Sequence, residues 1–146
     1  MREVKYRTWW SKTMCEVTCI DFAYNECFLK YQLQTTNDFI EKIVPLNEVK
    51  IMQWTGLKDK NGTEIYEGDI VKYPHIVSEK SNWEVSFRRG SFVIKQKHFG
   101  ISLHELSHKN NLEVIGNIYE NPELLGRKNA FSKLSYFCKK CFEKDN

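Results

Sequence analysis

WTGLKDKNGTEIYEGDIVKY, residues 54–73, holds two turns between three runs of strand-forming residues. A strand over Val49–Thr55 leads into the turn Asp59–Gly62, and the chain returns over Thr63–Tyr66. The Asn-Gly pair in that turn favours a tight hairpin, because hairpin turns of two residues need positive φ angles. The second turn, Glu67–Asp69, opens a third strand over Ile70–Tyr73. The sequence therefore predicts a compact β unit in the middle of the chain.

Alternating apolar residues predict further strands on both sides of this unit. Before it, the expected strands are Val4–Trp10, Cys15–Cys19 and Cys27–Leu33, and the last two form a hairpin. After it come a long hairpin from Trp83 to Ile94, which turns at Arg89-Gly90, and a strand over Leu112–Tyr119. The fold class is therefore mainly β, with an aromatic and β-branched core.

Helical signals are few and short. The segment Thr35–Leu46 has little alternation, so we expect a short helical turn there, capped by Asn37 or Asp38 and ended by Pro45. Asn121-Pro122-Glu123 is typical of a helix start, with Asn121 as the capping residue. Beyond Gly126, apolar residues recur at spacings of three and four, which predicts a C-terminal amphipathic helix. These residues are Phe131, Leu134, Cys138 and Cys141.

The bulk composition fits one domain with an appendage. The chain has 146 residues, of which 41% are hydrophobic and 14% aromatic. It has no apolar run near the ~20 residues that cross a bilayer, and its start lacks the apolar core of a secretory signal. Five cysteines, an odd number, argue for reduced thiols and not for a disulfide framework. We expect a cytoplasmic protein without a membrane partner.

Positive charge is concentrated at the C-terminus. The net charge is +3, but the last twenty residues hold six Lys or Arg against two acids, so the rest of the chain carries about −1. A nearly neutral body is a poor footprint for nucleic acid. Any electrostatic attraction to phosphate therefore depends on the tail, whose charges could equally serve only to solvate it.

Three segments resemble the YopX family. They are the stretch at residues 54–73, NLEVIGNIYENPELL at residues 111–125, and the opening MREVKYRTW. The resemblance implies a phage or prophage origin in Gram-positive bacteria and an SH3-like barrel, with no established activity and no catalytic residues. It places a YopX-like β-barrel domain at residues 1–126. Residues 127–146 depart from the family pattern and form the basic helical extension.

His104-Glu105-Leu106-Ser107-His108 spells HExxH, which on a helix presents two zinc ligands and a general base. A structural explanation is also available. Ser102 and Glu105 form a capping box, and Leu103 with Leu106 gives a short helix one buried edge. No spacing singles out a third ligand, although His98 and Glu113 are available. We therefore expect no zinc, no catalytic residue and no cofactor.

Two pairs of cysteines have spacings that suggest metal sites. Cys15 and Cys19, if they lie on one strand, are roughly 13 Å apart at ~3.3 Å per residue, which is too far for one ion. They are better explained as small core side chains. Cys138 and Cys141 share a side of the expected tail helix, where they could bind metal, oxidise or simply be half-buried.

A basic strip is the candidate binding site. It joins the tip of the long hairpin, the following arm and the tail, and Trp9, Trp10 and Trp54 are available as stacking surfaces. The alternative is that the lysines protect a sheet edge and keep the protein soluble. The binding residues that we predict are Arg88, Arg89, Lys95, Lys97, Lys133, Phe137, Lys139 and Lys140.

Three functions remain open from the sequence. The preferred one is a phage-encoded, non-enzymatic accessory protein that binds a host or phage protein, with inhibition of a host defence as one role. The second is nucleic-acid binding through the basic strip and the tail. The third and weakest is an HExxH zinc hydrolase. Because the tail carries much apolar surface, we also expect it to dock on the barrel or to form a homo-oligomer.

Overall fold

The computed structural model describes residues 3–33, 35–74, 82–96, 99–107 and 111–126. The first half holds β1 (Tyr6–Trp10), β2 (Thr13–Asp21), β3 (Glu26–Gln32), β4 (Phe39–Pro45), the 3-10 turn η1 (Leu46–Glu48), β5 (Lys50–Lys58) and β6 (Glu64–Tyr66). The second half holds β7 (Asp69–Lys72), β8 (Asn82–Arg88), β9 (Ser91–Gln96), β10 (Phe99–Ser102), α1 (Leu103–Ser107), β11 (Glu113–Asn117) and η2 (Pro122–Leu125). Within these residues there is no helix whose length and apolar character would let it span a bilayer.

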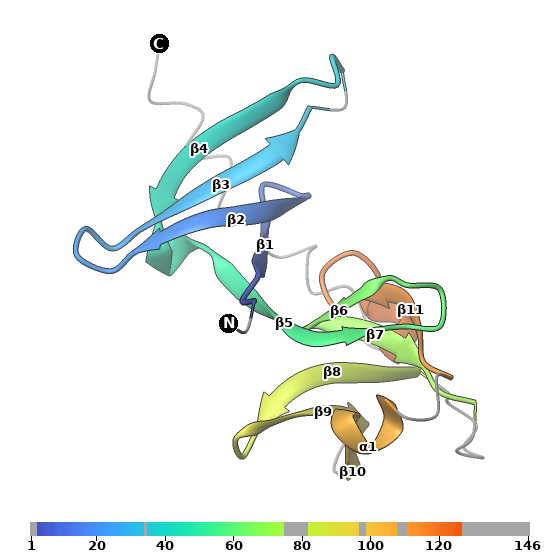
Figure 1. Ribbon diagram of the computed structural model, residues 1–146. Helices are drawn as coiled ribbons and strands as arrows, with labels where there is room; N and C mark the ends of the chain where they lie inside the picture. Colours follow the sequence, from blue (N-terminus) through green and yellow to red (C-terminus); the bar gives the residue numbers. More distant parts are fainter. Residues whose placement is uncertain (1–2, 34, 75–81, 97–98, 108–110, 127–146) are drawn as a thin grey trace.

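The strands form two antiparallel sheets, which confirms the mainly β prediction. The first has six strands in the order β4-β3-β2-β1-β5-β6, and the second has five in the order β10-β9-β8-β7-β11. In Figure 1, β2 to β4 lie at the top of the view and β8 to β10 at the bottom, with β5 running between them. Both sheets are open in the described part of the chain, so the closed SH3-like barrel is not shown.

The first sheet has a core of its own on one face. Strand alternation buries Cys15, Cys27, Leu29 and Val44, and Val49 closes this cluster from the end of η1. Burying small thiols and branched side chains in this way removes apolar surface from water at about 25 cal/mol per Å². The predicted hairpin of Cys15–Cys19 with Cys27–Leu33 is confirmed as β2 and β3.

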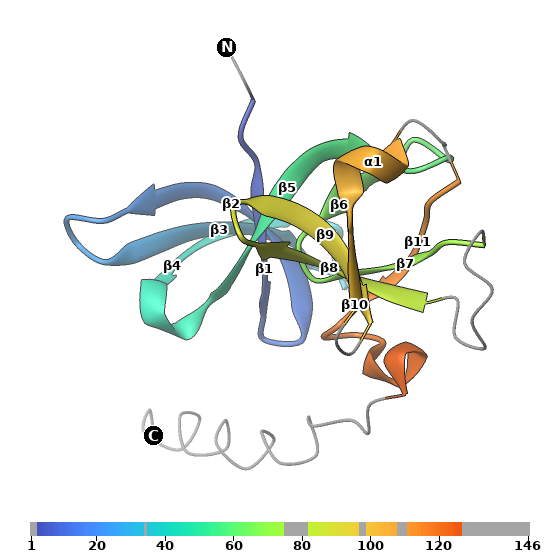
Figure 2. The ribbon, with the colours of Figure 1, turned by 90° about the horizontal axis from the view of Figure 1, so that it is seen from below.

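The second sheet has a separate core, which α1 covers. Val85 pairs with Ile94 across β8 and β9, so both side chains lie on one face, and the predicted hairpin is confirmed. The helix contributes Leu103 and Leu106, both buried in the same cluster with Trp83. Figure 2 shows α1 lying next to β9 and β10. The predicted buried edge of this short helix is therefore confirmed.

Four local predictions need correction. The helical turn expected in Thr35–Leu46 is wrong, because residues 39–45 pair along their whole length with β3 and form β4. The prediction that Asn61 and Gly62 both have positive φ angles is also wrong, because within Asp59–Gly62 only Gly62 does. The turn is stabilised by the Asp59 side chain, which accepts hydrogen bonds from the N–H groups of Asn61 and Thr63. Asn121 precedes a 3-10 turn but makes no capping hydrogen bond with its side chain.

The fourth correction concerns Cys19, which is exposed and not in the core. The register of β2 against β3 shifts between Val17 and Cys19, so one extra residue is accommodated in β2. Because side chains alternate along a strand, a shift of one residue moves Cys19 to the face opposite Cys15. The predicted tail helix at residues 127–146 lies outside the described residues.

Candidate functional site

The predicted basic strip is only partly visible in the structure. Arg88 ends β8 and Arg89 follows in a tight turn with left-handed φ angles, 50° at Arg89 and 82° at Gly90, and both arginines are exposed. Lys95 is half-buried and forms an ion pair with Glu84 at 3.1 Å, so its charge is largely neutralised. The remaining predicted members lie outside the described residues. They are Lys97, Lys133, Phe137, Lys139 and Lys140.

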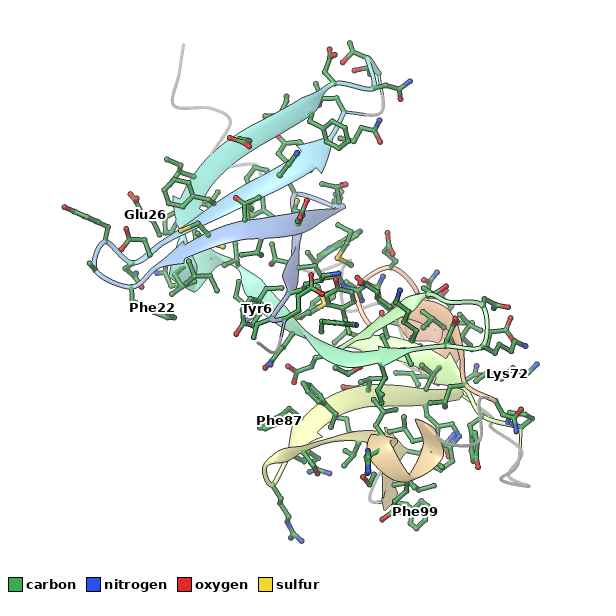
Figure 3. The ribbon with its side chains drawn as sticks, viewed as in Figure 1. Tyr6, Phe22, Glu26, Lys72, Phe87 and Phe99 are labelled. Atoms are coloured by element: carbon green, nitrogen blue, oxygen red, sulfur yellow. The ribbon has the colours of Figure 1, made fainter. Side chains whose placement is uncertain are left out.

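Phe87 gives the hairpin tip an aromatic surface. Its side chain is 50% exposed and packs edge-to-face on Phe92, with ring centroids 5.1 Å apart. Figure 3 shows Phe87 at the end of β8. The tip therefore combines two arginines with one exposed ring, a combination that can contact a phosphate chain and a base.

The two sheets are joined by a buried ion pair between Arg7 of β1 and Asp69 of β7. The Asp69 side chain is almost completely buried and also accepts the N–H of Tyr66 at 2.8 Å. Burial raises the pKa of the Asp69 carboxyl, and the Arg7 guanidinium and the Tyr66 N–H oppose that shift. Arg7 also lies over the Tyr66 ring, 4.4 Å from its centroid. The guanidinium is thus held by a carboxylate and an aromatic face.

Lys5 makes a second, more exposed set of contacts beside the first. Its Nζ donates to Glu64 Oε1 at 2.6 Å and lies 4.9 Å from the centroid of the Trp54 ring. The Tyr66 hydroxyl donates to the other Glu64 oxygen at 2.9 Å. The hydrogen bond from Lys5 lowers the pKa of Glu64, whereas burial raises the pKa of Tyr66 to about 12. We call Lys5, Arg7, Trp54, Glu64, Tyr66 and Asp69 the junction cluster.

An open cleft of about 620 Å³ lies beside the junction cluster. Lys5, Arg7 and Glu64 line one wall, and residues of β2, Glu16 among them, line the other. Lys5 and Glu64 pair with each other, and Arg7 pairs with Asp69, which does not line the cleft. The Arg7 Nε is buried without a hydrogen-bond partner. A nucleophile with an adjacent base, the arrangement that covalent catalysis needs, is not found among these lining residues.

A smaller hollow of about 370 Å³ lies between β5 and β8. Two carboxylates, Glu67 and Glu84, line it, and both have partners already. Glu67 accepts the N–H of Phe87 at 3.3 Å, and Glu84 holds Lys95. Tyr119 closes the hollow and stacks on Trp9 with an interplanar angle of 11°. Because both carboxylates already have partners within the protein, this hollow is a weak candidate for a ligand site.

The structure describes only the first four residues of the HExxH segment. His104 and Glu105 lie on α1 and are exposed, whereas His108 lies outside the described residues. No three side chains of His, Cys, Asp or Glu gather around a common point within the ranges that the structure describes. The zinc hypothesis thus receives no support from the residues that are placed, and its second histidine is untested.

The outer face of β4 carries exposed apolar side chains that sequence reasoning missed. Phe39 is 65% and Ile43 53% exposed, and both point away from the core face that Val44 occupies. Ile43 is opposite Phe28 of β3, which is opposite Cys19 of β2, so an apolar row crosses three strands. We call Cys19, Phe28, Phe39 and Ile43 the outer face.

A row of alternating charges crosses the first sheet on the same side as the outer face. Strand register places Arg7 opposite Glu16, Glu16 opposite Lys30, and Lys30 opposite Glu41. Opposite charges that pair across strands stabilise a sheet by about 0.2–1 kcal/mol per pair. Here Arg7 is paired with Asp69, and the Lys30 Nζ lies over the Phe39 ring, 5.0 Å from its centroid, so the row is one of register and not of formed ion pairs. The row runs from the junction cluster to the edge strand β4 and ends there with a negative charge.

The sequence contained a signal for the junction cluster but not for the outer face. All six cluster residues fall within two of the segments on which the family resemblance was recognised. Charged Lys5 and Arg7 also alternate with Tyr6 and Thr8, which marks them as a second face of β1. The outer face had no such signal, because residues 35–46 were assigned to a helical turn.

Comparison with known proteins finds one matching family and a similar solved structure. The sequence model of the family described as YopX protein matches residues 5–126. The chain is also similar to the crystal structure of protein EF1440 from Enterococcus faecalis, with 32% sequence identity and a TM-score of 0.60. That similarity covers 86% of this chain and 99% of the other. A search of curated proteins found no match.

Proposed function

Because the chain belongs to the YopX family, we propose that it is a phage or prophage accessory protein, without enzymatic activity, that binds a partner protein in the bacterial cytoplasm. The outer face carries this proposal. Phe39 and Ile43 lie on an edge strand with more than half of each side chain in water. Exposed apolar side chains that cluster on one face are typical of protein-binding surfaces.

The contacts of the junction cluster indicate a structural role and not a catalytic one. Arg7 and Asp69 join the two sheets, whereas Lys5 and Glu64 pair on the side of the first sheet. Both cations also lie over aromatic rings. A catalytic group needs an accessible atom and a pKa suited to proton transfer. Burial instead raises the pKa of the Tyr66 hydroxyl to about 12, far from neutral pH.

The test is capture of a partner by tagged protein from lysate of bacteria infected with a phage of this lineage, quantified by mass spectrometry. The double variant Phe39→Ser/Ile43→Thr removes the apolar side chains of β4. Phe22→Ser is the matched control, because Phe22 is at least as exposed but lies in the turn between β2 and β3 (Figure 3). We expect one polypeptide to be lost at least tenfold with the double variant and retained with the control. Equal capture by all three proteins, or none by the wild type, contradicts the proposal.

Inhibition of a host defence is the biological role that we propose for this binding. Expression of the protein in a host that resists phage infection should then restore plaque formation. The Phe39→Ser/Ile43→Thr variant should not restore it, while Phe22→Ser should. If the wild-type protein captures a polypeptide from the lysate of such a host but does not restore plaque formation on it, the protein binds a partner without inhibiting a host defence.

A second candidate function is binding of single-stranded nucleic acid at the tip of the β8–β9 hairpin. The observation that favours it is the exposed Phe87 ring beside Arg88 and Arg89. The affinity for single-stranded nucleic acid should fall steeply as salt is added. In Arg88→Ser/Arg89→Asn, the slope of the logarithm of the binding constant against the logarithm of the salt concentration should be shallower by about 0.7 for each phosphate contact that is lost. Deletion of residues 127–146 should weaken binding further. Affinity that does not change with salt would exclude this function.

We also propose a closed barrel for the domain and self-association of the chain. The SH3-like barrel that the family resemblance implies is proposed for the strands of the domain at residues 1–126. Self-association is proposed to depend on residues 127–146, whose predicted apolar side chains would pack on a second subunit. Deleting these residues should then halve the solution mass measured by light scattering. A monomer before and after the deletion would contradict the proposal.

A further inference from the structure

We propose that the free edge of β4 binds an extended segment of a different protein as an additional antiparallel strand, and that its central Glu41-Lys42 pair disfavours the same pairing with a second copy of this chain. This inference rests on the proposed function, since it specifies how a partner protein is bound. It concerns the main chain of β4 and the charges at its centre, and not the apolar outer face alone.

The edge of β4 is long and regular. All seven residues, Phe39–Pro45, are in register with β3, without a bulge. On its other side, no strand of the described part of the chain pairs with it, and Figure 1 shows β4 as the outermost strand of its sheet. An edge of this kind offers a row of N–H and C=O groups to another strand. Adding a strand to such an edge is an established way to bind a peptide.

The charge row across the first sheet specifies what the next strand should carry. The row reads Arg7, Glu16, Lys30, Glu41, with signs that alternate from strand to strand. A lysine opposite Glu41 would continue the alternation. On the core side, the Lys42 Nζ lies over the ring of Trp10 of β1, 4.6 Å from its centroid. A glutamate opposite Lys42 would pair with that charge.

The flanking residues complete the pattern. Ile40 and Ile43 lie on either side of the central pair and favour apolar residues opposite them. Antiparallel strands run in opposite directions, so the partner reads, from its N-terminus, apolar-Glu-Lys-apolar. β4 itself reads Ile-Glu-Lys-Ile, which matches this pattern letter by letter. Whether a second copy could bind therefore depends on geometry.

Geometry excludes the matching register between two copies. Two copies that pair antiparallel through β4 are related by a rotation of half a turn about an axis perpendicular to the sheet. This rotation leaves the outer faces of both copies on the same side of the combined sheet. Residues directly opposite each other must point to the same side of the sheet, so they must both come from the outer face or both from the core face. The matching register would instead set Glu41, on the outer face, opposite Lys42, on the core face.

The registers that rotation does allow are unfavourable. The register with the greatest overlap sets Lys42 opposite Lys42, and a register centred on Glu41 sets Glu41 opposite Glu41. Like charges directly opposite each other destabilise a sheet. A register centred on Ile43 sets Glu41 opposite Pro45, which has no N–H to donate. The edge is thereby protected against its own copies, while Phe39 and Ile43 stay exposed for a different partner.

The test uses a cyclic β-hairpin peptide whose free strand reads Thr-Val-Glu-Lys-Val-Thr, with Thr-Val-Lys-Glu-Val-Thr as a control of identical composition. Cyclisation reduces the entropy lost on binding. Binding to the full chain is followed by the amide shifts of β4 in NMR titrations. We expect the first peptide to bind about tenfold more tightly, since both charge pairs change sign between the two. The variant Glu41→Lys/Lys42→Glu should reverse the preference.

N-methylation distinguishes strand pairing from side-chain contact. Methyl groups on the outward main-chain nitrogens of the free strand should abolish binding by the first peptide. Binding that survives methylation, equal affinity for the two peptides, or no binding by either would overturn the proposal. A dimer of the wild-type protein would also overturn the proposal if Glu41→Lys/Lys42→Glu still dimerises and Ile43→Pro does not. That result would mean that β4 pairs with β4 of a second copy.

The partner-capture experiment separates this inference from the proposed function. If the captured polypeptide is lost with Phe39→Ser/Ile43→Thr but retained in full with Glu41→Lys/Lys42→Glu, the protein binds a partner through its outer face and the edge-pairing inference fails alone. If no polypeptide is captured by the wild type, the proposed function fails whatever the peptides do. Loss with both variants is the result that we expect.

Discussion

Arg7 of β1 donates a hydrogen bond to the carboxylate of Asp69 of β7, a residue 62 positions later in the chain. The pair is largely shielded from water and links the first sheet to the second. Because the Tyr66 N–H and the Tyr66 ring also contact it, the ion pair is part of a connected polar network. The contact between the sheets therefore depends on charges as well as on apolar packing.

Removing the arginine should destabilise the protein strongly. Arg7→Met leaves the Asp69 carboxylate buried without its cation, and we expect a loss of about 3 kcal/mol in the free energy of unfolding. Lys5→Met is the matched control, since Lys5 is more exposed and its ion pair with Glu64 should contribute little. Urea denaturation of the three proteins measures the difference. Equal stability of the two variants would contradict a special role for Arg7.

Asp59 should make the protein sensitive to acid. Burial alone would raise the pKa of this carboxyl, but N–H groups of Val114, Thr63 and Asn61 donate to it and lower its pKa overall. A lowered pKa contributes stability above the unfolded value of about 3.9, and that stability is lost as the pH falls through the folded value. We expect the free energy of unfolding to fall below about pH 4, and less steeply in Asp59→Asn.

At neutral pH the same variant tests the hydrogen bond to β11. An amide nitrogen in place of one carboxylate oxygen cannot accept the N–H of Val114, so Asp59→Asn should cost about 1–3 kcal/mol. Asp38→Asn, in the exposed turn before β4, should change the free energy of unfolding by less than about 0.5 kcal/mol. Similar effects of the two substitutions would show that the Asp59 contacts contribute little.

Gly116 should not tolerate a methyl group while Asn121 is present. A Cβ at this position would lie 2.4 Å from the Oδ1 atom of Asn121, which is closer than non-bonded atoms approach. We expect Gly116→Ala to lower the free energy of unfolding by about 1–3 kcal/mol. The double variant with Asn121→Ala should recover much of that loss relative to Asn121→Ala alone. No recovery would indicate that the backbone at Gly116, and not the neighbouring side chain, sets the limit.

The three described thiols should react at different rates. Cys19 is exposed on the outer face, whereas Cys15 and Cys27 are buried, and burial raises the pKa of Cys15 to about 11. Because the thiolate is the reactive form, iodoacetamide at pH 7.5 should label Cys19 well before the other two. Peptide mass mapping over time measures each site separately. Labelling of Cys19 that is as slow as that of Cys15 in the folded protein would contradict the position of the β2 bulge.

Local patterns predicted most of the strands, because alternation and turn residues act over a few positions. The turn at Arg89-Gly90 illustrates this, since its left-handed φ angles follow from residue types that are adjacent in the chain. β4 was missed for the complementary reason. Its residues alternate poorly, and their strand conformation depends on pairing with β3, which is a tertiary contact.

The binding surfaces divide in the same way. The sequence by itself determined the family, the mainly β class and the exposed arginines at the hairpin tip, because these depend on residue identity and short spacing. Only the tertiary structure decided that Arg7 meets Asp69, that a one-residue bulge exposes Cys19, and that Lys95 is paired with Glu84. Strand register sets such contacts, and a shift of a single residue reverses which face a side chain occupies.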